Sequence, residues 1–193
     1  MAYTALFVSE QRMKQWTSLD SNVEVNEITP FIINAQDIYI QDSLGTKFYN
    51  RLKTGIVDDN LTANETTLLN EYVAPMLMQY ALYLMMPSLK YKMVNKGILN
   101  GTSEETAPTS LDELKYLRQS ALDMAEFYNK RLIEYLCDNP GVFPQYDAPG
   151  TEGMRPNKRN PYFSGLVTPR KYKSYYDEKC DDCGIIEGPA IED

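Results

Sequence analysis

Apolar residues recur every three or four positions over most of the first 140 residues, which is the spacing of one face of an α-helix. The first clear example is PFIINAQDIYIQDSL, where Thr29 can cap a helix and Pro30 takes the first helical position, at which its missing N–H does no harm. Gly45 ends this segment. A shorter helix, TKFYNRLK, is expected to follow and to end at Gly55.

Two capping boxes mark the starts of two longer helices, at Thr62–Glu65 and at Ser110–Glu113. In each, the hydroxyl accepts a backbone N–H three residues on, and the glutamate accepts the N–H of the capping residue. The second box predicts a helix of about 27 residues, roughly 40 Å long, that ends at Asn139-Pro140-Gly141. Its predicted apolar stripe comprises Leu111, Leu114, Leu117, Ala121, Leu122, Met124, Ala125, Tyr128, Leu132, Tyr135 and Leu136.

The helix that follows the first box is predicted to be the buried centre of the fold. Its methionines and tyrosines between Tyr72 and Tyr91 suit adaptable packing. Because they are more numerous than one helical face needs, part of this stretch is also a candidate contact with a neighbouring subunit. Pro75 is expected to kink the helix and Pro87 to break it, with a helical continuation to Lys96.

These patterns predict an all-α fold, a helical bundle of about four main helices with a long extended C-terminal arm. Strand signals are weak and confined to residues 5–8 and 23–25. Six of the eleven prolines fall between Pro140 and Pro169, which favours a boundary in that region. We therefore expect a helical body at residues 1–145 and an arm at residues 146–193.

Charge supports this division, because its sign changes along the chain. Residues 1–150 carry 12 basic and 19 acidic side chains, net −7. Residues 151–174 carry six basic side chains against Glu152, net +5, and residues 175–193 carry Lys179 against seven acids, net −6. The arm is also rich in tyrosine and phenylalanine, unlike most disordered segments. It is interpreted as an extended segment that docks on another surface, with a flexible tail, or a tail docked on its own body, as the alternatives.

The composition of the chain excludes some classes of catalytic and metal site and disfavours some classes of binding. The chain has no histidine, which excludes a Ser-His or Cys-His nucleophile pair and a histidine metal ligand within it. Its net charge of −8 disfavours general nucleic-acid binding, which depends on Lys and Arg at phosphates. No segment is long and apolar enough to span a bilayer, and the N-terminus does not resemble a signal peptide. We expect a cytosolic product or one assembled inside a cell.

The three cysteines leave several interpretations open. Cys180 and Cys183 have the C-x-x-C spacing of a half zinc site or a redox pair, but a closed zinc site needs four ligands and Cys137 is the only other thiol. Two thiols without such a role are the simpler interpretation. A site shared between neighbouring subunits would supply the missing ligands. We therefore assign no metal and no cofactor.

The remaining charged motifs carry no recognisable catalytic signature. The acidic pairs, such as Asp58-Asp59 and Asp112-Glu113, suit loops and helix first turns. No glycine-rich phosphate-binding loop is present. The compact basic cluster Arg155, Lys158 and Arg159 suits either DNA phosphates or an acidic protein surface. These features favour a binding or structural protein over an enzyme; an enzyme that uses carboxylates with an external metal is a third hypothesis, for which no convincing acid pair is found.

The order of segments is similar to that of a known family. A short N-terminal segment, FVSEQRMKQWT, precedes ITPFIINAQDIYIQDSLGTKFYNRLK. Then come LTANETTLLNEYVAPMLMQYALYLMMPSLKYKMVNKGI, a polar gap and LDELKYLRQSALDMAEFYNKRLIEYL. Over roughly residues 5–140 this resembles the head–tail connector (adaptor, or head-completion) proteins of tailed bacteriophages, and most of all those of crAss-like phages. The chain beyond about residue 145 departs from the compact connectors.

The resemblance implies a structural virion protein that forms a ring of identical copies, usually dodecameric, between the portal and the tail. Such a ring extends the DNA channel without binding DNA specifically and offers a docking platform to other ring or tail proteins. It implies a place at the neck of the virion, with assembly in the host bacterial cytoplasm. The alternative is a small acidic regulatory adaptor that binds a basic host or phage protein. The expected interaction residues are Arg155, Lys158, Arg159, Tyr162, Phe163, Arg170, Lys171, Lys173, Tyr175 and Tyr176.

Overall fold

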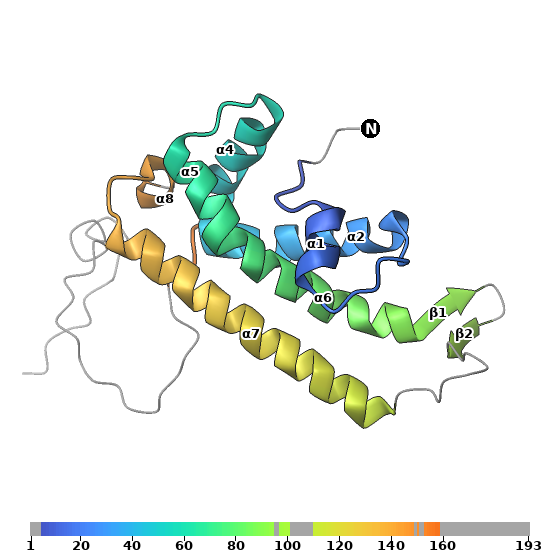
Figure 1. The fold of residues 1–193 in the computed structure, drawn as a ribbon. Coiled ribbons are helices and arrows are strands. Elements are labelled where there is room, and N and C mark those ends of the chain that lie inside the picture. Colours follow the sequence, from blue (N-terminus) through green and yellow to red (C-terminus); the bar gives the residue numbers. More distant parts are fainter. Residues whose placement is uncertain (1–4, 95–96, 101–109, 149, 151–152, 159–193) are drawn as a thin grey trace, which may run out of the picture. The chain divides into compact units, whose positions relative to one another are not determined.

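The computed structural model describes residues 5–94, 97–100, 110–148, 150 and 153–158. Its elements are α1 (Glu10–Trp16), α2 (Val25–Ala35), η1 (Gln36–Ile40), α3 (Gln41–Leu44), α4 (Thr46–Val57), α5 (Ala63–Thr67), η2 (Leu68–Val73), α6 (Ala74–Lys90), β1 (Tyr91–Val94), β2 (Gly97–Asn100), α7 (Leu111–Asp138) and α8 (Pro144–Asp147), where η marks a π-helical turn. Within this described part, four long helical stretches run over residues 25–44, 46–57, 63–90 and 111–138 (Figure 1). The predicted all-α fold is confirmed.

The stretch 63–90, formed by α5, η2 and α6, is the centre of the body. Helix α6 packs against α7 on one side and α2 on another (Figure 1). Its side chains are buried around most of the circumference, among them Met76, Leu77, Tyr80 and Met85. Fully burying side chains of this size contributes roughly 1.5–3 kcal/mol each relative to exposure. The prediction of a buried central helix is therefore confirmed.

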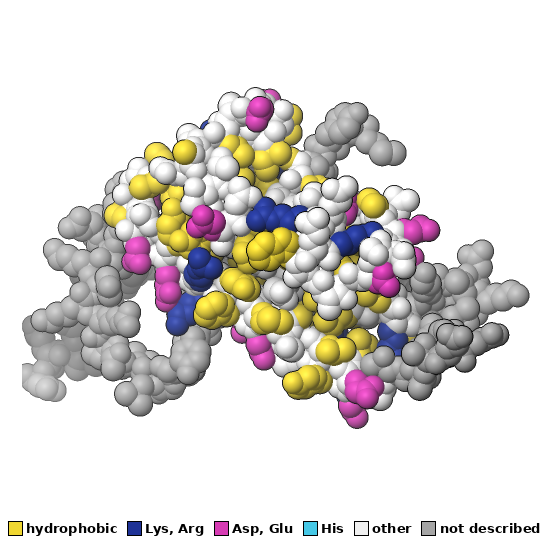
Figure 2. Space-filling model, in the orientation of Figure 1, with side chains coloured by type: hydrophobic (Ala, Val, Ile, Leu, Met, Phe, Trp, Pro, Cys, Tyr) yellow, Lys and Arg dark blue, Asp and Glu magenta, His cyan; other side chains and the backbone are white. Residues whose placement is uncertain are grey.

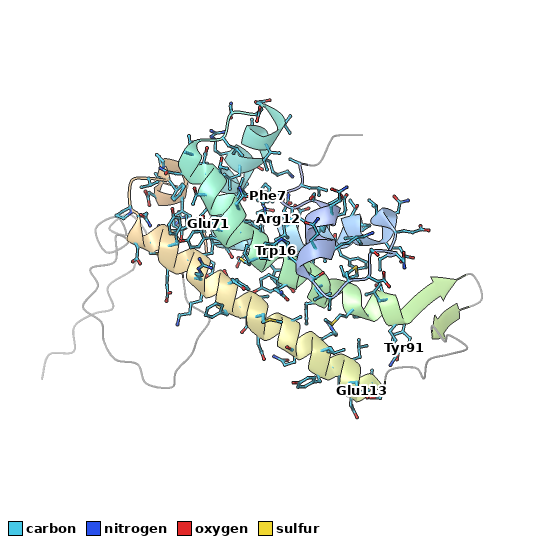
Figure 3. All side chains as sticks on the ribbon, in the orientation of Figure 1. Phe7, Arg12, Trp16, Glu71, Tyr91 and Glu113 are labelled. Atoms are coloured by element: carbon cyan, nitrogen blue, oxygen red, sulfur yellow. The ribbon has the colours of Figure 1, made fainter. Side chains whose placement is uncertain are left out.

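Proline affects this helix in ways the sequence pattern only partly predicts. Pro75 follows the π-helical turn η2, and its ring nitrogen has no hydrogen to donate to the carbonyl of Asn70, its partner in the i→i+5 pattern. Arg12 of α1 donates to that carbonyl at 3.0 Å, and to the Asn70 side-chain oxygen at 2.6 Å (Figure 3). Pro87 does not break the helix, which runs on to Lys90.

The expected helical continuation to Lys96 is wrong. Residues 91–94 and 97–100 form a two-stranded antiparallel hairpin, in which Val94 pairs with Gly97 and Tyr91 with Asn100. The last helical hydrogen bond runs from the N–H of Tyr91 to the carbonyl of Pro87. The hairpin adds a short β element to an otherwise helical fold.

The start of the first long helix also differs from the prediction. Helix α2 begins at Val25 after Glu24, so Thr29 and Pro30 lie inside it. The Thr29 hydroxyl donates to the Val25 carbonyl and to Glu10 of α1 instead of capping a terminus. The helix tolerates Pro30 because its buried residues, such as Ile28 and Ile32, hold both sides of the proline in the core.

Both capping boxes are confirmed, and they differ in environment. Glu65 is 5% exposed and also pairs with Arg51 of α4 at 3.1 Å, which ties α4 to α5. Glu113 lies exposed in the first turn of α7 (Figure 3), and two hydrogen bonds with Ser110 hold its pKa below the usual range. Helix α7 ends at Asp138, as the Asn139-Pro140-Gly141 signal predicts.

Candidate interaction surface

The last described residues of the chain, which we call the strap (residues 153–158), lie on the corner between α3 and α4. The Thr46 N–H donates to the Met154 carbonyl at 2.9 Å, and the Met154 N–H donates to the Thr46 hydroxyl at 2.8 Å. The Asn157 N–H donates to the Asp42 carbonyl at 2.9 Å. The strap is neither helix nor strand, and these bonds satisfy backbone groups that a neighbouring strand would pair with in a sheet.

Two glycines make this close approach possible. Gly45 and Gly153 have φ values of 76° and 78°, a region that L side chains rarely adopt. A Cβ on Gly45 would lie 2.7 Å from the Cδ of Pro156, and one on Gly153 would lie 2.7 Å from the Cβ of Thr46. Glycine at residues 45 and 153 therefore lets the backbone of the strap approach the backbone of the α3–α4 corner closely.

An aromatic cluster holds the chain that leads to the strap. Phe143 and Tyr146 are buried, and both rings contact Phe48 of α4, at centroid separations of 5.4 and 6.3 Å. The Lys158 ammonium lies 4.7 Å from the centroid of the Tyr146 ring, a cation–π distance. Lys47 donates to the Ala148 carbonyl at 2.9 Å. The described residues at 143–148 and 153–158 therefore contact the body.

Of the predicted interaction residues, the structure describes two. Arg155 is exposed on the strap, and Lys158 is half-buried over Tyr146. The others lie outside the described residues: Arg159, Tyr162, Phe163, Arg170, Lys171, Lys173, Tyr175 and Tyr176. Both residues lie in the strap, whose backbone is hydrogen-bonded to the α3–α4 corner. The other basic residues of 151–174 follow directly in the sequence.

A second surface, on α7, was not predicted. Leu117 and Met124 were expected in the buried stripe, but they are 48% and 44% exposed. Tyr116 and Phe127 are 74% and 63% exposed on the same outer side of the helix. Leu111, also assigned to the stripe, is 53% exposed at the first residue of α7. Hydrophobic atoms are visible along α7 in Figure 2. An excess of apolar residues was inferred from the sequence only for residues 72–91, whereas those of α7 were assigned to a single buried stripe.

The buried polar groups serve to join helices. Ser43 of α3 donates to the Tyr39 carbonyl and to Asn129 of α7, each at 2.9 Å. Tyr80 of α6 also interacts with Asn129, and burial raises the pKa of Tyr80 to about 12. At neutral pH the phenol is therefore a neutral hydrogen-bonding group and not a base.

Gln36, on the π-helical turn η1, joins the N-terminal segment to α4. Its side chain accepts from the Phe7 N–H at 3.0 Å and donates to the Ala5 carbonyl at 2.9 Å and to the Tyr49 hydroxyl at 3.2 Å. Burial, together with a hydrogen bond to Asp37, raises the pKa of Tyr49. The arrangement anchors residues 5–7 on the core.

The described residues contain neither a cluster of metal ligands nor a membrane-spanning helix. There, no three of the acidic and thiol side chains lie close enough together to hold a metal ion. Cys137 is a free, exposed thiol near the end of α7, whereas Cys180 and Cys183 lie outside the described residues. None of the described helices combines the length and the apolar character needed to cross a membrane.

Comparison with known proteins gives one family. A family model described as a family of unknown function, DUF6712, matches residues 40–155, more than half of the chain. The chain belongs to DUF6712. No curated protein and no solved structure matches it. The DUF6712 match spans α4, the central helix, α7, α8 and the first half of the strap, so both surfaces described above lie largely within the part that the family shares.

Proposed function

We propose that this DUF6712 protein is a structural subunit that assembles with copies of itself into a ring at the head–tail junction of a tailed phage, where its C-terminal arm binds a neighbouring subunit or the portal. The order of the helical segments, which resembles that of head–tail connectors, supplies the class of assembly. The contacts that anchor the strap on the body support it. In this proposal the protein acts by binding and carries no enzymatic activity.

The observation that carries the proposal is the anchored root of the arm. Two hydrogen bonds between backbones and one from the Met154 N–H to the Thr46 hydroxyl hold residues 153–158 on the α3–α4 corner, at a close approach that Gly45 and Gly153 permit. A flexible tail with no binding role does not need its first residues to be hydrogen-bonded to the domain. Anchoring limits the volume that the following residues can sample, and so raises their effective concentration at a nearby surface.

Charge indicates what the arm binds. Residues 151–174 carry a net charge of +5 and residues 1–150 a net charge of −7. The body of a neighbouring copy therefore attracts the basic block of the arm, and the same acidic bodies, lining a channel, would repel the phosphates of DNA passing through it. Attraction of this kind weakens as added salt shortens the range of exposed charges.

Electron microscopy of purified phage particles that contain this chain tests the proposal. We expect density for a ring of copies between portal and tail, with the arm of each copy extending from the strap onto an adjacent protein. Replacing Arg170, Lys171 and Lys173 together by glutamate should reduce the number of particles that carry tails. The control Lys115→Glu, which reverses a single charge on α7, should not.

Two results would contradict the proposal. One is absence of the chain from tailed particles. The other is recovery of the full-length protein in a stable complex with a basic host protein and with no virion component, which would favour the small acidic adaptor instead.

A further inference from the structure

The outer side of α7 carries a row of residues with the spacing of a helix–helix seam. Glu113, Leu117, Ser120, Met124, Phe127 and Arg131 follow one another at intervals of four, three, four, three and four residues. This alternation keeps one face of an α-helix in line over five turns, about 27 Å. Apart from half-buried Ser120, the members of this row, which we call the α7 seam, are exposed.

The α7 seam is symmetric in spacing and opposite in charge at its two ends. Read from either end, the intervals are the same, and the midpoint lies at residue 122. Glu113 stands at one end and Arg131 at the other, with the apolar Leu117, Met124 and Phe127 between them. A second α7 laid antiparallel over that midpoint places Glu113 opposite Arg131 twice, Leu117 opposite Phe127 and Ser120 opposite Met124. A parallel arrangement would place like charges opposite each other at both ends.

A shallow hollow at the Glu113 end fits the same arrangement. It is lined by Asp112, Glu113, Tyr116 and Leu117, and its surface is almost entirely apolar. Antiparallel pairing brings the Phe127 ring and the Arg131 guanidinium of the other copy to this hollow. An apolar hollow whose lining residues include Asp112 and Glu113 is suited to both groups.

Both charged ends are held in place within their own chain. Glu113 accepts the Ser110 N–H at 2.7 Å, and a carboxylate can accept further hydrogen bonds. The Arg131 guanidinium stacks at 4.8 Å over the ring of Tyr72, which itself stacks on Tyr135 at 4.0 Å. Less side-chain freedom is therefore lost when the two ends pair than for side chains that move freely.

We propose that the α7 seam is the docking surface for a second copy of this chain, which binds it antiparallel through its own α7 seam to form a two-fold symmetric dimer. This contact is isologous, so it closes at two copies and differs in kind from the head-to-tail contacts of a ring. It does not rest on the function proposed above. Because the seam is short compared with a standard interface, we expect a dissociation constant on the order of micromolar.

Charge reversal tests both the partner and its orientation, using full-length protein. Sedimentation equilibrium should show a concentration-dependent dimer for the wild type. Arg131→Glu places carboxylates opposite each other at both ends, and Glu113→Arg does the same with cations, so each variant alone should dimerise roughly 10- to 100-fold more weakly. An equimolar mixture of the two variants should dimerise again, because each end then joins unlike charges. The double variant E113R/R131E should also dimerise.

Controls separate pairing from folding. Lys115→Glu changes the charge of α7 by the same amount as Arg131→Glu but lies off the seam, and should leave the dimer intact. Phe127→Glu, at a side chain that is 63% exposed, should abolish the dimer without changing the helical circular dichroism. It also tests the seam without disturbing the Glu113 cap.

Three results would overturn the inference: a wild type that stays monomeric well above micromolar concentration, an oligomer whose mass Phe127→Glu and Arg131→Glu leave unchanged, or variants that do not recover on mixing. Each of these can occur while the protein is still found at the head–tail junction. The dimer and the proposed function can therefore fail separately.

Discussion

The two long helical stretches at the centre of the body are alike in sequence signal and different in structure. Each begins at a capping box, and they run over residues 63–90 and 111–138. The first contains a π-helical turn and two prolines, and is buried around most of its circumference. The second, α7, is regular throughout and exposes apolar side chains on its outer face. Tertiary contacts stabilise the irregular helix, whereas the regular one satisfies its own backbone and leaves apolar side chains exposed.

The largest expected difference between the two helices is in the cost of losing a leucine. Leu77 of α6 is fully buried, so Leu77→Ala should lower the free energy of unfolding by about 3 kcal/mol, through lost burial and the cavity left behind. Leu117 of α7 is 48% exposed, and Leu117→Ala should cost about 0.5 kcal/mol. Urea denaturation of the full chain at a concentration that keeps it monomeric measures both. Equal losses would show that α7 is covered in the monomer.

The next largest expected difference is in what the two capping boxes contribute to the free energy of unfolding. Glu65→Gln removes one charge of a buried ion pair and leaves the Arg51 guanidinium without its carboxylate, so we expect a loss of about 2–3 kcal/mol. The same change at Glu113 affects an exposed cap and should cost much less. Chemical denaturation of the two glutamine variants makes the comparison. A larger loss at Glu113 would mean that the environment of a capping box does not set its contribution.

What the sequence predicts well in this chain is local. The hydroxyl–glutamate boxes at residues 62 and 110 need only four residues to form, and the structure has both. Pro30 and Pro87 were mispredicted because tertiary packing decides whether a helix continues past them, and the segment 91–100 was mispredicted because it pairs with itself as a hairpin. Packing on both sides of Pro30 outweighs the loss of one hydrogen bond, and residues 91–94 exchange helical hydrogen bonds for strand partners three to nine positions further along the chain.

The candidate surfaces show the same division. The basic cluster could be recognised in the sequence. The contact of the strap with the α3–α4 corner could not, because that contact joins Thr46 and Asp42 to residues more than 100 positions later. On α7, Leu117 and Met124 were counted with the core since their spacing suits either side of the helix. Only the position of α6 decides which side is covered.

Alkaline pH should affect the buried helix through Tyr80. Burial raises the pKa of this phenol from 10.0 to about 12 in the folded protein. Between these values the unfolded chain loses the proton while the folded one keeps it, so the stability that Tyr80 contributes is complete below pH 10 and is lost as the pH rises through about 12. Tyr80→Phe should flatten the decline in unfolding free energy over this range. An unchanged pH profile in that variant would assign the decline to other groups, such as Tyr49, whose pKa is also raised.

The smallest expected effect concerns two arginines, Arg12 of α1 and Arg131 of α7, that both contact the irregular stretch 63–90. Arg12 donates to the backbone carbonyl of Asn70, to which Pro75 cannot donate because it has no N–H. Arg12→Met removes this donor and should lower the free energy of unfolding by about 1 kcal/mol. Arg131 of the regular helix α7 stacks over Tyr72 of η2, and Arg131→Met should cost about 0.5 kcal/mol. Replacing Pro75 by alanine supplies the missing N–H and should reduce the cost of Arg12→Met, which a double-mutant cycle measures. If the two changes are additive instead, Arg12 stabilises the central helix only through its contact with the Asn70 side chain.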